Sequence, residues 1–307
     1  MHQPQSQHSI EGHSSRKSVV QIESLTRDYG QNRGVFDVDI NLFAGEVVGF
    51  IGPNGAGKST TINMLTGLIE PGSGRLNLFG QHRMGAEIQG LKHRMGILYS
   101  EPVFPGFLTP ETIFQRNARM REIPDSSWQA MATKLEVDLK RPFGSLSLGN
   151  RKKVGVVTAL MHQPDLVIVD EPTSGLDPLV QKHFLELISE VKDRGGTILL
   201  SSHVLSEVEA ICDRIIMIKK GKIIKEEQTQ ELLNSLPRVF RLMNLTDDVL
   251  QKILQTGVID TQQRVAQETR LYTQNSAPVL AILAEVGITD FFIERLSLEE
   301  MFLEYYS

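Results

Sequence analysis

The chain has a single cysteine, Cys212, among its 307 residues, so no disulfide can form within it. Cys212 lies in the stretch VEAICDRII, whose pattern indicates a small apolar core residue between a helix and a strand. Because the chain does not depend on disulfides, a reducing, cytoplasmic location is the expectation.

The sequence also lacks any long apolar run, because no stretch reaches the roughly 18 consecutive apolar residues that a membrane-spanning helix needs. Residues 1–17 are polar and have no apolar segment of the kind found in a secretory signal. We interpret them as a disordered tail. Its three histidines, His2, His8 and His13, are expected to be solvated rather than bound to a metal.

The chain also has no excess of basic residues over acidic ones. The formal net charge is -5, which argues against a general nucleic-acid binder. The content of 40% hydrophobic and 22% charged residues is that of an ordinary globular chain, and the length allows two domains. There is no internal repeat to indicate a solenoid or another repeat architecture.

Residues 18–232 show alternating strand and helix patterns. The expected strands are VVQIESL, EVVGFIG, DLVIVDE and GTILLSS, and the expected helices are KSTTINMLTGLI and HFLELISEVKDR. Continuous apolar strands between amphipathic helices predict an α/β domain with a mainly parallel sheet covered on both faces. Residues from about 83 to 160 are richer in helical pattern, and we expect them to form a helical insert.

The pattern changes toward the C-terminus. Residues 236–307 predict the order strand, helix, strand, strand, helix, strand, which is that of a ferredoxin-like unit. The segments are RVFRLMN, DDVLQKILQ, GVID, RVAQETRLY, APVLAILAEVG and ITDFFIERL. Ser297 and Glu300 then form a capping-box pattern in front of a last helix, LEEMFLEYY. We expect a small α+β accessory domain.

A phosphate-binding loop stands near the N-terminus, matching G-x-x-x-x-G-K-S/T between an apolar strand and a helix. Its backbone N–H groups are expected to surround a β-phosphate, and Lys58 to reach the β- and γ-phosphate oxygens. The Ser59 hydroxyl is expected to ligate Mg²⁺, with Thr60 supporting the loop. The alternative is a glycine turn with an incidental lysine. The loop consists of Gly52, Pro53, Asn54, Gly55, Ala56, Gly57, Lys58, Ser59 and Thr60.

Two carboxylates end the apolar strand LVIVDE. Burial of Asp170 and Glu171 at a strand end is costly unless they face a cation or water. Asp170 suits the surroundings of Mg²⁺, and Glu171 is placed to polarise an attacking water. His203 follows the next apolar strand and is expected to contact the γ-phosphate and orient that water. The alternatives are two solvated acids and a structural histidine, and the upstream phosphate loop favours the catalytic interpretation.

These motifs together resemble those of the ATP-binding cassette (ABC) ATPases. GPNGAGKST, LSLGN, LVIVDE, SGLD and His203 occur in family order, and the resemblance covers most of residues 18–230. GTPases and small kinases share the phosphate loop but not this set. The resemblance implies a P-loop NTPase cassette that binds ATP and Mg²⁺, with a RecA-like core, an antiparallel β subdomain and a helical insert. It also implies that Tyr29 stacks on adenine and that Asp177 of SGLD contributes to the nucleotide site.

The signature LSLGN implies a dimer. In this family the signature faces the γ-phosphate of ATP bound to the other subunit, so Ser147 and Gly149 would contact a nucleotide held by the partner's Lys58. A second cassette must therefore come from another copy or a paralogue. Leu148 and Asn150 depart from the usual LSGGQ. The basic residues 151–153 that follow are expected to form a solvated helix face.

The segment MGILYSEP departs from the family pattern at the Q-loop. It has Ser100 where glutamine or glutamate is usual, with Glu101 adjacent. Either Glu101 supplies the metal contact after a small shift, or that contact is weakened.

The end of the chain, LSLEEMFLEYY, resembles the tail of ABC ATPases that serve exporters with separately encoded membrane subunits. This implies an ATP-hydrolysing subunit on the cytoplasmic side of the membrane that drives a permease docked around residues 100–111. No nucleic-acid partner is expected. One alternative is a soluble ABC ATPase acting on ribosomes or DNA, but such proteins usually carry two cassettes or a long coiled-coil insert. Another is a regulatory cassette without turnover, motivated by Ser100 and the altered signature.

Overall fold

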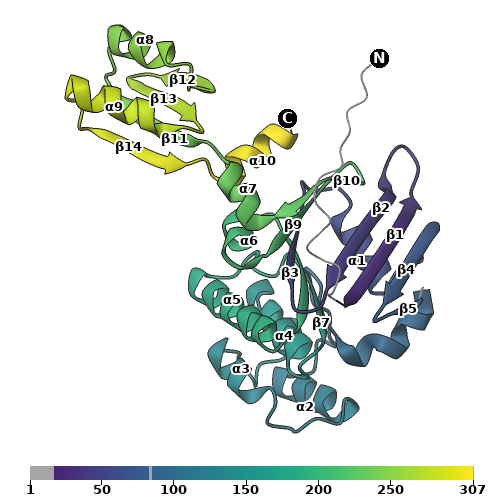
Figure 1. Cartoon of the computed structure of the whole chain (residues 1–307). Coiled ribbons are helices and arrows are strands. Elements are labelled where there is room, and N and C mark those ends of the chain that lie inside the picture. The colour runs from purple at the N-terminus through teal and green to yellow at the C-terminus, as the bar shows by residue number, and fades with distance from the viewer. Residues whose placement is uncertain (1–16, 83–84, 307) are drawn as a thin grey trace. The chain divides into compact units, whose positions relative to one another are not determined.

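The computed structural model describes residues 17–82 and 85–306, and the chain divides into two compact units between Glu226 and Glu227 (Figure 1). Of the predicted tail only Lys17 is described, so the rest of it, with its three histidines, lies outside the described residues. Among the residues that are described, no helix combines the length and the apolar character needed to cross a membrane.

A six-stranded sheet forms the centre of the first unit, in the order β10-β9-β3-β8-β7-β6. The strands from β6 to β9 pair in parallel, and every residue of β3 and β7 is buried. The continuous apolar pattern predicted for these strands agrees with this burial, because both faces of the sheet are covered. The bounds are β3 (Val47–Ile51), β6 (Met95–Leu98), β7 (Leu166–Asp170), β8 (Thr197–Ser202), β9 (Arg214–Lys219) and β10 (Lys222–Gln228).

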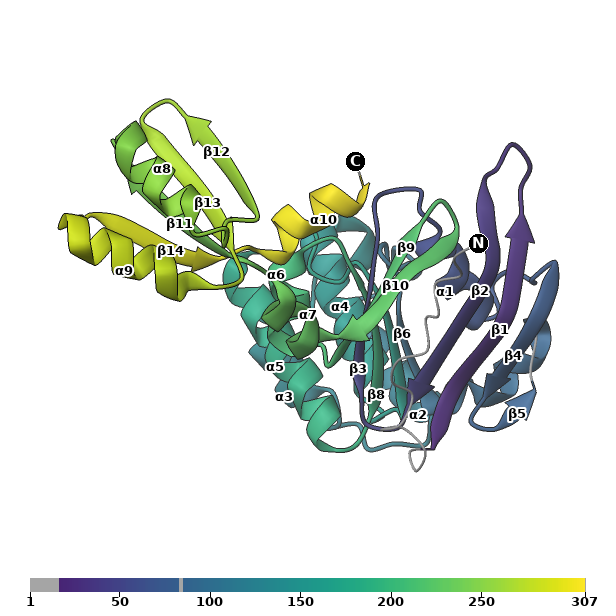
Figure 2. The same ribbon diagram turned by 45° about the horizontal axis from the view of Figure 1, so that its top comes forward.

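An antiparallel sheet in the order β2-β1-β4-β5 accompanies the parallel sheet (Figure 2). Helix α1 (Lys58–Leu65) joins the two, because Ile62 lies in the same apolar cluster as Val20 of β1 and Phe50 of β3. The shared cluster holds the start of α1, and with it the phosphate loop, in a fixed place. The strands are β1 (Ser18–Asp28), β2 (Gly34–Phe43), β4 (Ser73–Leu78) and β5 (Gln81–His82).

The predicted insert is mostly helical, but it contains one strand of the central sheet. β6 pairs in parallel with β7, so the prediction of a helical segment is wrong at Met95–Leu98. Four residues are too few to show a strand period in the sequence. Besides α1, the helices of the first unit are η1 (Gly85–Arg94), α2 (Pro110–Met120), α3 (Gln129–Lys134), η2 (Phe143–Ser145), α4 (Leu148–Leu160), α5 (Pro178–Asp193) and α6 (Leu205–Ile211).

Cys212 follows α6 directly and is buried, as the sequence predicts. A side chain at Gly49 of β3 would come within 3.1 Å of the Cys212 sulfur, so the thiol fills space beside the central sheet. Burial raises the pKa of this thiol far above its usual value. Cys212 is therefore an inert core residue.

The second unit contains a four-stranded antiparallel sheet in the order β12-β13-β11-β14. Helices α8 and α9 cover one face, where Phe240, Leu271 and Leu283 share an apolar cluster. The elements are α7 (Thr229–Ser235), β11 (Arg238–Met243), α8 (Asp247–Gln255), β12 (Thr261–Val265), β13 (Glu268–Thr273), α9 (Ser276–Val286), β14 (Phe291–Arg295) and α10 (Leu298–Tyr306).

The structure corrects the strand bounds predicted for this unit and confirms the predicted capping box. The segment GVID is not a strand; β12 begins only at Thr261, and RVAQETRLY is split at Ala266, whose φ of 55° makes the turn. The predicted capping box before α10 is confirmed. The Ser297 N–H donates to Glu300 Oε2 at 3.1 Å, and the Glu300 N–H donates to Ser297 Oγ at 3.2 Å.

Candidate active site

The phosphate loop connects β3 to α1, and its glycines are required by geometry. Gly57 caps α1 with φ 117°, and Gly55 has φ 79°, which are left-handed conformations that glycine adopts without strain. A Cβ at Gly52 would lie 2.4 Å from the carbonyl oxygen of Ile218. The loop therefore follows a path that leaves the N–H groups at the start of α1 available for an anion.

Lys58 points back over this loop. Its side chain is 5% exposed, and Nζ donates to the carbonyl oxygen of Gly52 at 2.7 Å. Nζ also lies 3.6 Å from Glu171 Oε1. Beside it is a hollow of about 260 Å³, which brings together most of the predicted nucleotide-binding residues. It is lined by Tyr29, Arg33, Gly34, Asn54, Gly55, Gly57, Lys58, Ser59, Thr60 and Glu171.

Ser59 and Asp170 meet at the edge of the hollow. The Ser59 hydroxyl donates to Asp170 Oδ2 at 2.9 Å, while the buried Oδ1 atom has no hydrogen-bond partner. A hydroxyl beside a carboxylate with a free oxygen is the donor set that Mg²⁺ prefers when phosphates complete its shell. Within residues 17–82 and 85–306, no three His, Cys, Asp or Glu side chains cluster to hold a metal unaided. These residues fit a Mg²⁺ ion that arrives with phosphate ligands.

Glu171 and His203 follow adjacent parallel strands, so their side chains meet at one edge of the sheet. Glu171 Oε2 lies 2.9 Å from His203 Nδ1. Glu171 has φ 49°, and its N–H donates to the carbonyl oxygen of Ser201 at 2.9 Å. This left-handed turn directs the carboxylate into the hollow rather than into the sheet. A carboxylate paired with an imidazole beside a phosphate site can accept a proton from water.

The prediction of a solvated basic face on α4 is wrong. Lys152 is only 2% exposed and Lys153 9%. Lys152 Nζ donates to the carbonyl oxygens of Glu171 at 2.8 Å and Ser174 at 2.6 Å. Burial lowers the pKa of Lys152. The sequence pattern of α4 gives no sign of this, because packing around the helix decides which positions reach solvent.

A second buried charge supports the same turn from another side. Glu207 of α6 accepts from the Thr173 hydroxyl at 2.8 Å and from the Ser202 hydroxyl at 3.3 Å. Burial raises the pKa of Glu207, an effect that these hydrogen bonds oppose. The turn after β7 is thus tied to α6 and to the end of β8.

The signature residues lie apart from the hollow of their own chain. Ser147 caps α4 and accepts from the Asn150 N–H at 3.3 Å. A Cβ at Gly149 would lie 2.9 Å from the carbonyl oxygen of Gly175. Asp177 caps α5, accepting from the N–H of Val180 at 3.1 Å. None of Ser147, Gly149 and Asp177 lines the hollow, so a single chain does not bring them to the phosphate loop.

Two further predicted residues have different surroundings. Tyr29 is half-exposed on the lining of the hollow, with the Arg27 guanidinium carbon 5.5 Å from its ring centroid. Glu101 is exposed after β6 and does not line the hollow. Sequence reasoning missed Arg33 and Gly34, which carry no motif and reach the hollow only through the β1–β2 turn.

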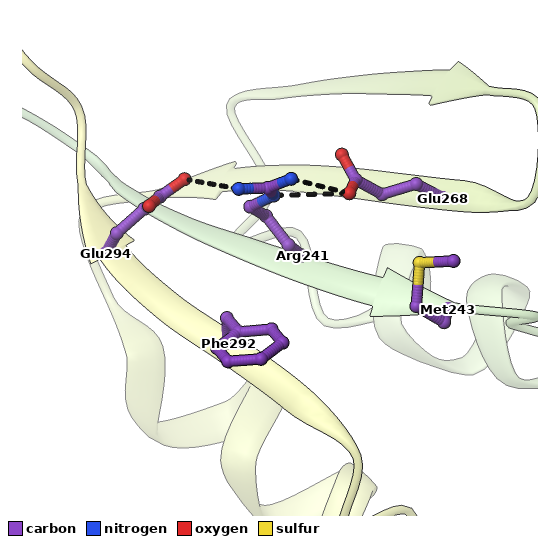
Figure 3. Close-up of a pocket in the computed structure, with 5 residues that line it drawn as sticks. All are labelled: Arg241, Met243, Glu268, Phe292 and Glu294. Carbon is purple, nitrogen blue, oxygen red and sulfur yellow. Dashed lines mark hydrogen bonds and ion pairs between the residues drawn. The ribbon is translucent and has the colours of Figure 1, made fainter.

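A smaller hollow of about 180 Å³ lies on the sheet face of the second unit, away from α8 and α9 (Figure 3). Arg241 is at its centre, with Nη2 2.8 Å from Glu268 Oε2 and Nη1 3.6 Å from Glu294 Oε1. Glu268 raises the pKa of Arg241, and Arg241 in turn lowers that of Glu268. These charges satisfy one another, so the hollow offers no group for acid–base chemistry.

The fold and the first site together define a P-loop nucleotide-binding ATPase. The family model described as ABC transporter matches residues 35–174. The chain is 33% identical to the bacitracin transport ATP-binding protein BcrA of Bacillus licheniformis, over 90% of this chain and 97% of that protein. It is 34% identical to the lantibiotic transport ATP-binding protein SrtF of Streptococcus pyogenes, over 71% and 96%.

Among solved structures, an ATP-binding subunit of an ABC transporter is similar with a TM-score of 0.63 and 28% identity, covering 70% of this chain and 91% of that one. The chain belongs to the ATP-binding proteins of ABC transporters. The predicted cassette fold and the predicted ATPase class are confirmed.

Proposed function

We propose that this chain hydrolyses Mg²⁺-bound ATP to drive a separately encoded permease, and that it works as an exporter subunit. The proposal rests on one observation, a group of side chains that lie together at the phosphate loop. Lys58 and Ser59 of the phosphate loop lie beside Asp170 and Glu171, and Glu171 pairs with His203.

Each side chain has a defined part in the reaction. Lys58 exchanges its hydrogen bond to Gly52 for the β- and γ-phosphate oxygens of ATP. Ser59 and Asp170 would hold Mg²⁺, which when bound would neutralise charge on the phosphates. Glu171 accepts a proton from the attacking water, and His203 orients Glu171 and the γ-phosphate. Tyr29 packs on the adenine.

The active unit in this proposal is a dimer of two cassettes. The second cassette is either another copy of this chain or a paralogue. Ser147 and Gly149 stand at an exposed helix start, outside the hollow of their own chain, where they are free to meet ATP bound to a partner. Asp177, which caps α5 outside the hollow of its own chain, is proposed to contribute to the nucleotide site in that dimer. ATP closes the dimer and hydrolysis reopens it.

The permease docks on the segment between β6 and α2. Val103 is 87% exposed and Phe107 79%, so two large apolar side chains lie open on a short stretch of surface. Such side chains are typical of a protein contact. This docking places the chain at the cytoplasmic side of the membrane, held through its permease.

The names of the relatives support the export of antimicrobial compounds. BcrA is a bacitracin transport protein, SrtF a lantibiotic transport protein, and LnrL of Bacillus subtilis, 34% identical over 67% of this chain, a linearmycin resistance protein. We propose a substrate of this class. Residues 236–307 form a ferredoxin-like accessory domain in this proposal.

Affinity purification tests the proposal. Tagged Glu171→Gln protein is isolated from detergent-solubilised membranes with ATP, and its partners are identified by mass spectrometry. A multi-span membrane protein is expected, and its absence together with ribosomal or DNA-bound partners contradicts the transport function. ATP hydrolysis by the wild type is compared with Lys58→Ala, and equal rates contradict the ATPase mechanism.

A further inference from the structure

Lys152 is a buried cation that contacts the turn after β7, residues 171–176, which is called the catalytic turn below. It comes from α4, the helix whose first residues are the signature, and it reaches the turn that follows β7. Its ammonium donates to two backbone carbonyls of that turn, at Glu171 and Ser174. A lysine that is 2% exposed and donates hydrogen bonds to two backbone oxygens has a fixed position.

The turn needs such support because its first residue is unfavourable by itself. Glu171 has φ 49°, a left-handed conformation that residues with a Cβ adopt rarely. Conformations of this kind persist only where surrounding structure holds them. Three hydrogen bonds provide this support. The Ser201 carbonyl oxygen accepts from the Glu171 N–H, Glu207 accepts from the Thr173 hydroxyl, and Lys152 donates to the Glu171 carbonyl oxygen.

The charge of Lys152 is balanced by its surroundings. Asp170, Glu171, Glu101 and Glu207 are all close enough for their charges to favour its ammonium form. An ammonium provides up to three donors and offsets acidic charge, whereas a neutral side chain provides fewer donors and no compensation.

We propose that Lys152 is a positioning residue that fixes the left-handed peptide of Glu171 and joins the signature helix to the catalytic carboxylate. The inference rests on the proposed function, in which Glu171 activates water and the signature contacts the partner's nucleotide. Ser147 begins the helix that carries Lys152, so a shift of the helix start on binding that nucleotide moves the Glu171 peptide. Each site thereby senses whether the other is occupied.

The test compares Lys152→Met and Lys152→Gln with the wild type in steady-state ATP hydrolysis. Lys152→Met is expected to lower kcat roughly 10–100-fold, the loss typical of a misplaced catalytic group, while KM and ATP affinity stay within about twofold. Lys152→Gln keeps a donor for one carbonyl, so its kcat is expected to lie between those of Lys152→Met and the wild type. Lys134→Met is the matched control, since Lys134 pairs with Glu186 and Glu190 on the surface.

Combining the variants separates positioning from general damage. In the Glu171→Gln background, Lys152→Met is expected to cause no further loss of the residual rate, because Lys152 acts through Glu171. An additive loss, or a wild-type kcat in Lys152→Met, overturns the inference. Should Lys152→Met fail to fold, the same comparison is made with Lys152→Gln.

A readout independent of hydrolysis distinguishes this inference from the proposed function. Hydrogen exchange of a peptide covering residues 171–176 is expected to be faster in Lys152→Gln than in the wild type, and unchanged exchange overturns the inference. If the wild type hydrolyses no more ATP than Lys58→Ala, the proposed function fails, whatever the exchange data show. Normal wild-type hydrolysis with an active Lys152→Met means that only the inference fails.

Discussion

Replacement of Glu171 by glutamine removes one charge from the site with almost no change in shape. The carboxylate lies 2.9 Å from His203 Nδ1 and 3.6 Å from Lys58 Nζ. An amide of the same size retains an oxygen that can face either partner, but it does not accept a proton from water. The substitution thus tests the base and leaves the rest of the site in place.

The size of the effect follows from the part assigned to Glu171. A positioned general base contributes about 10²–10⁴-fold to a rate. We therefore expect kcat to fall by about 10²–10⁴-fold, or about 3–5 kcal/mol in the activation barrier. ATP affinity is expected to rise, because removing a negative charge beside Lys58 lowers the repulsion of the triphosphate.

The assay has two parts. Phosphate release gives the rate, and light scattering after size-exclusion chromatography gives the mass with and without saturating ATP. Glu171→Gln is expected to form a stable dimer with ATP because the nucleotide is bound but not cleaved. Glu190→Gln, a surface carboxylate that pairs with Lys134, is the control and is expected to behave like the wild type.

Either of two results would refute this reasoning. Hydrolysis at the wild-type rate means that Glu171 is not the base. A variant that stays monomeric at saturating ATP means that the signature does not complete the partner's site.

Three further predictions concern the metal, the signature and pH. Asp170→Asn is expected to raise the Mg²⁺ concentration for half-maximal ATP hydrolysis by at least roughly tenfold, since it removes a charged ligand; an unchanged Mg²⁺ titration contradicts this. Gly149→Ala is expected to lower ATP-dependent dimerisation without weakening ATP binding to the monomer, because its Cβ would lie 2.9 Å from the Gly175 carbonyl; equilibrium binding and light scattering measure both. Burial, and then the charge of Arg121, lowers the pKa of His162 to about 4. Its unfolded pKa is near 6.5, so protonation favours the unfolded chain, and stability present above pH 6.5 is lost as the pH falls toward 4, by at most about 3 kcal/mol. Thermal melts of wild type and His162→Gln between pH 7.5 and 5 check this, and equal slopes contradict it.

The contiguous motifs were readable from the sequence because their chemistry depends on neighbours in the chain. The phosphate loop needs glycines and a lysine at fixed spacing, and the two acids end an apolar run. The split of RVAQETRLY was not readable, because the turn at Ala266 uses a positive φ that alanine does not signal. The strand β6 was missed because four residues inside a helical region carry no period of their own.

The sequence by itself thus determined the class of this chain, an ABC ATPase, and it predicts which residues meet phosphate, which hold the metal and which activate water. Only the tertiary structure decided how the catalytic turn is held. Lys152 reads as a solvated charge in a basic run, yet it is buried against Glu171 and Ser174. The physical reason is that burial of a charge depends on the segments that surround it, and those that surround Lys152 come from distant parts of the chain.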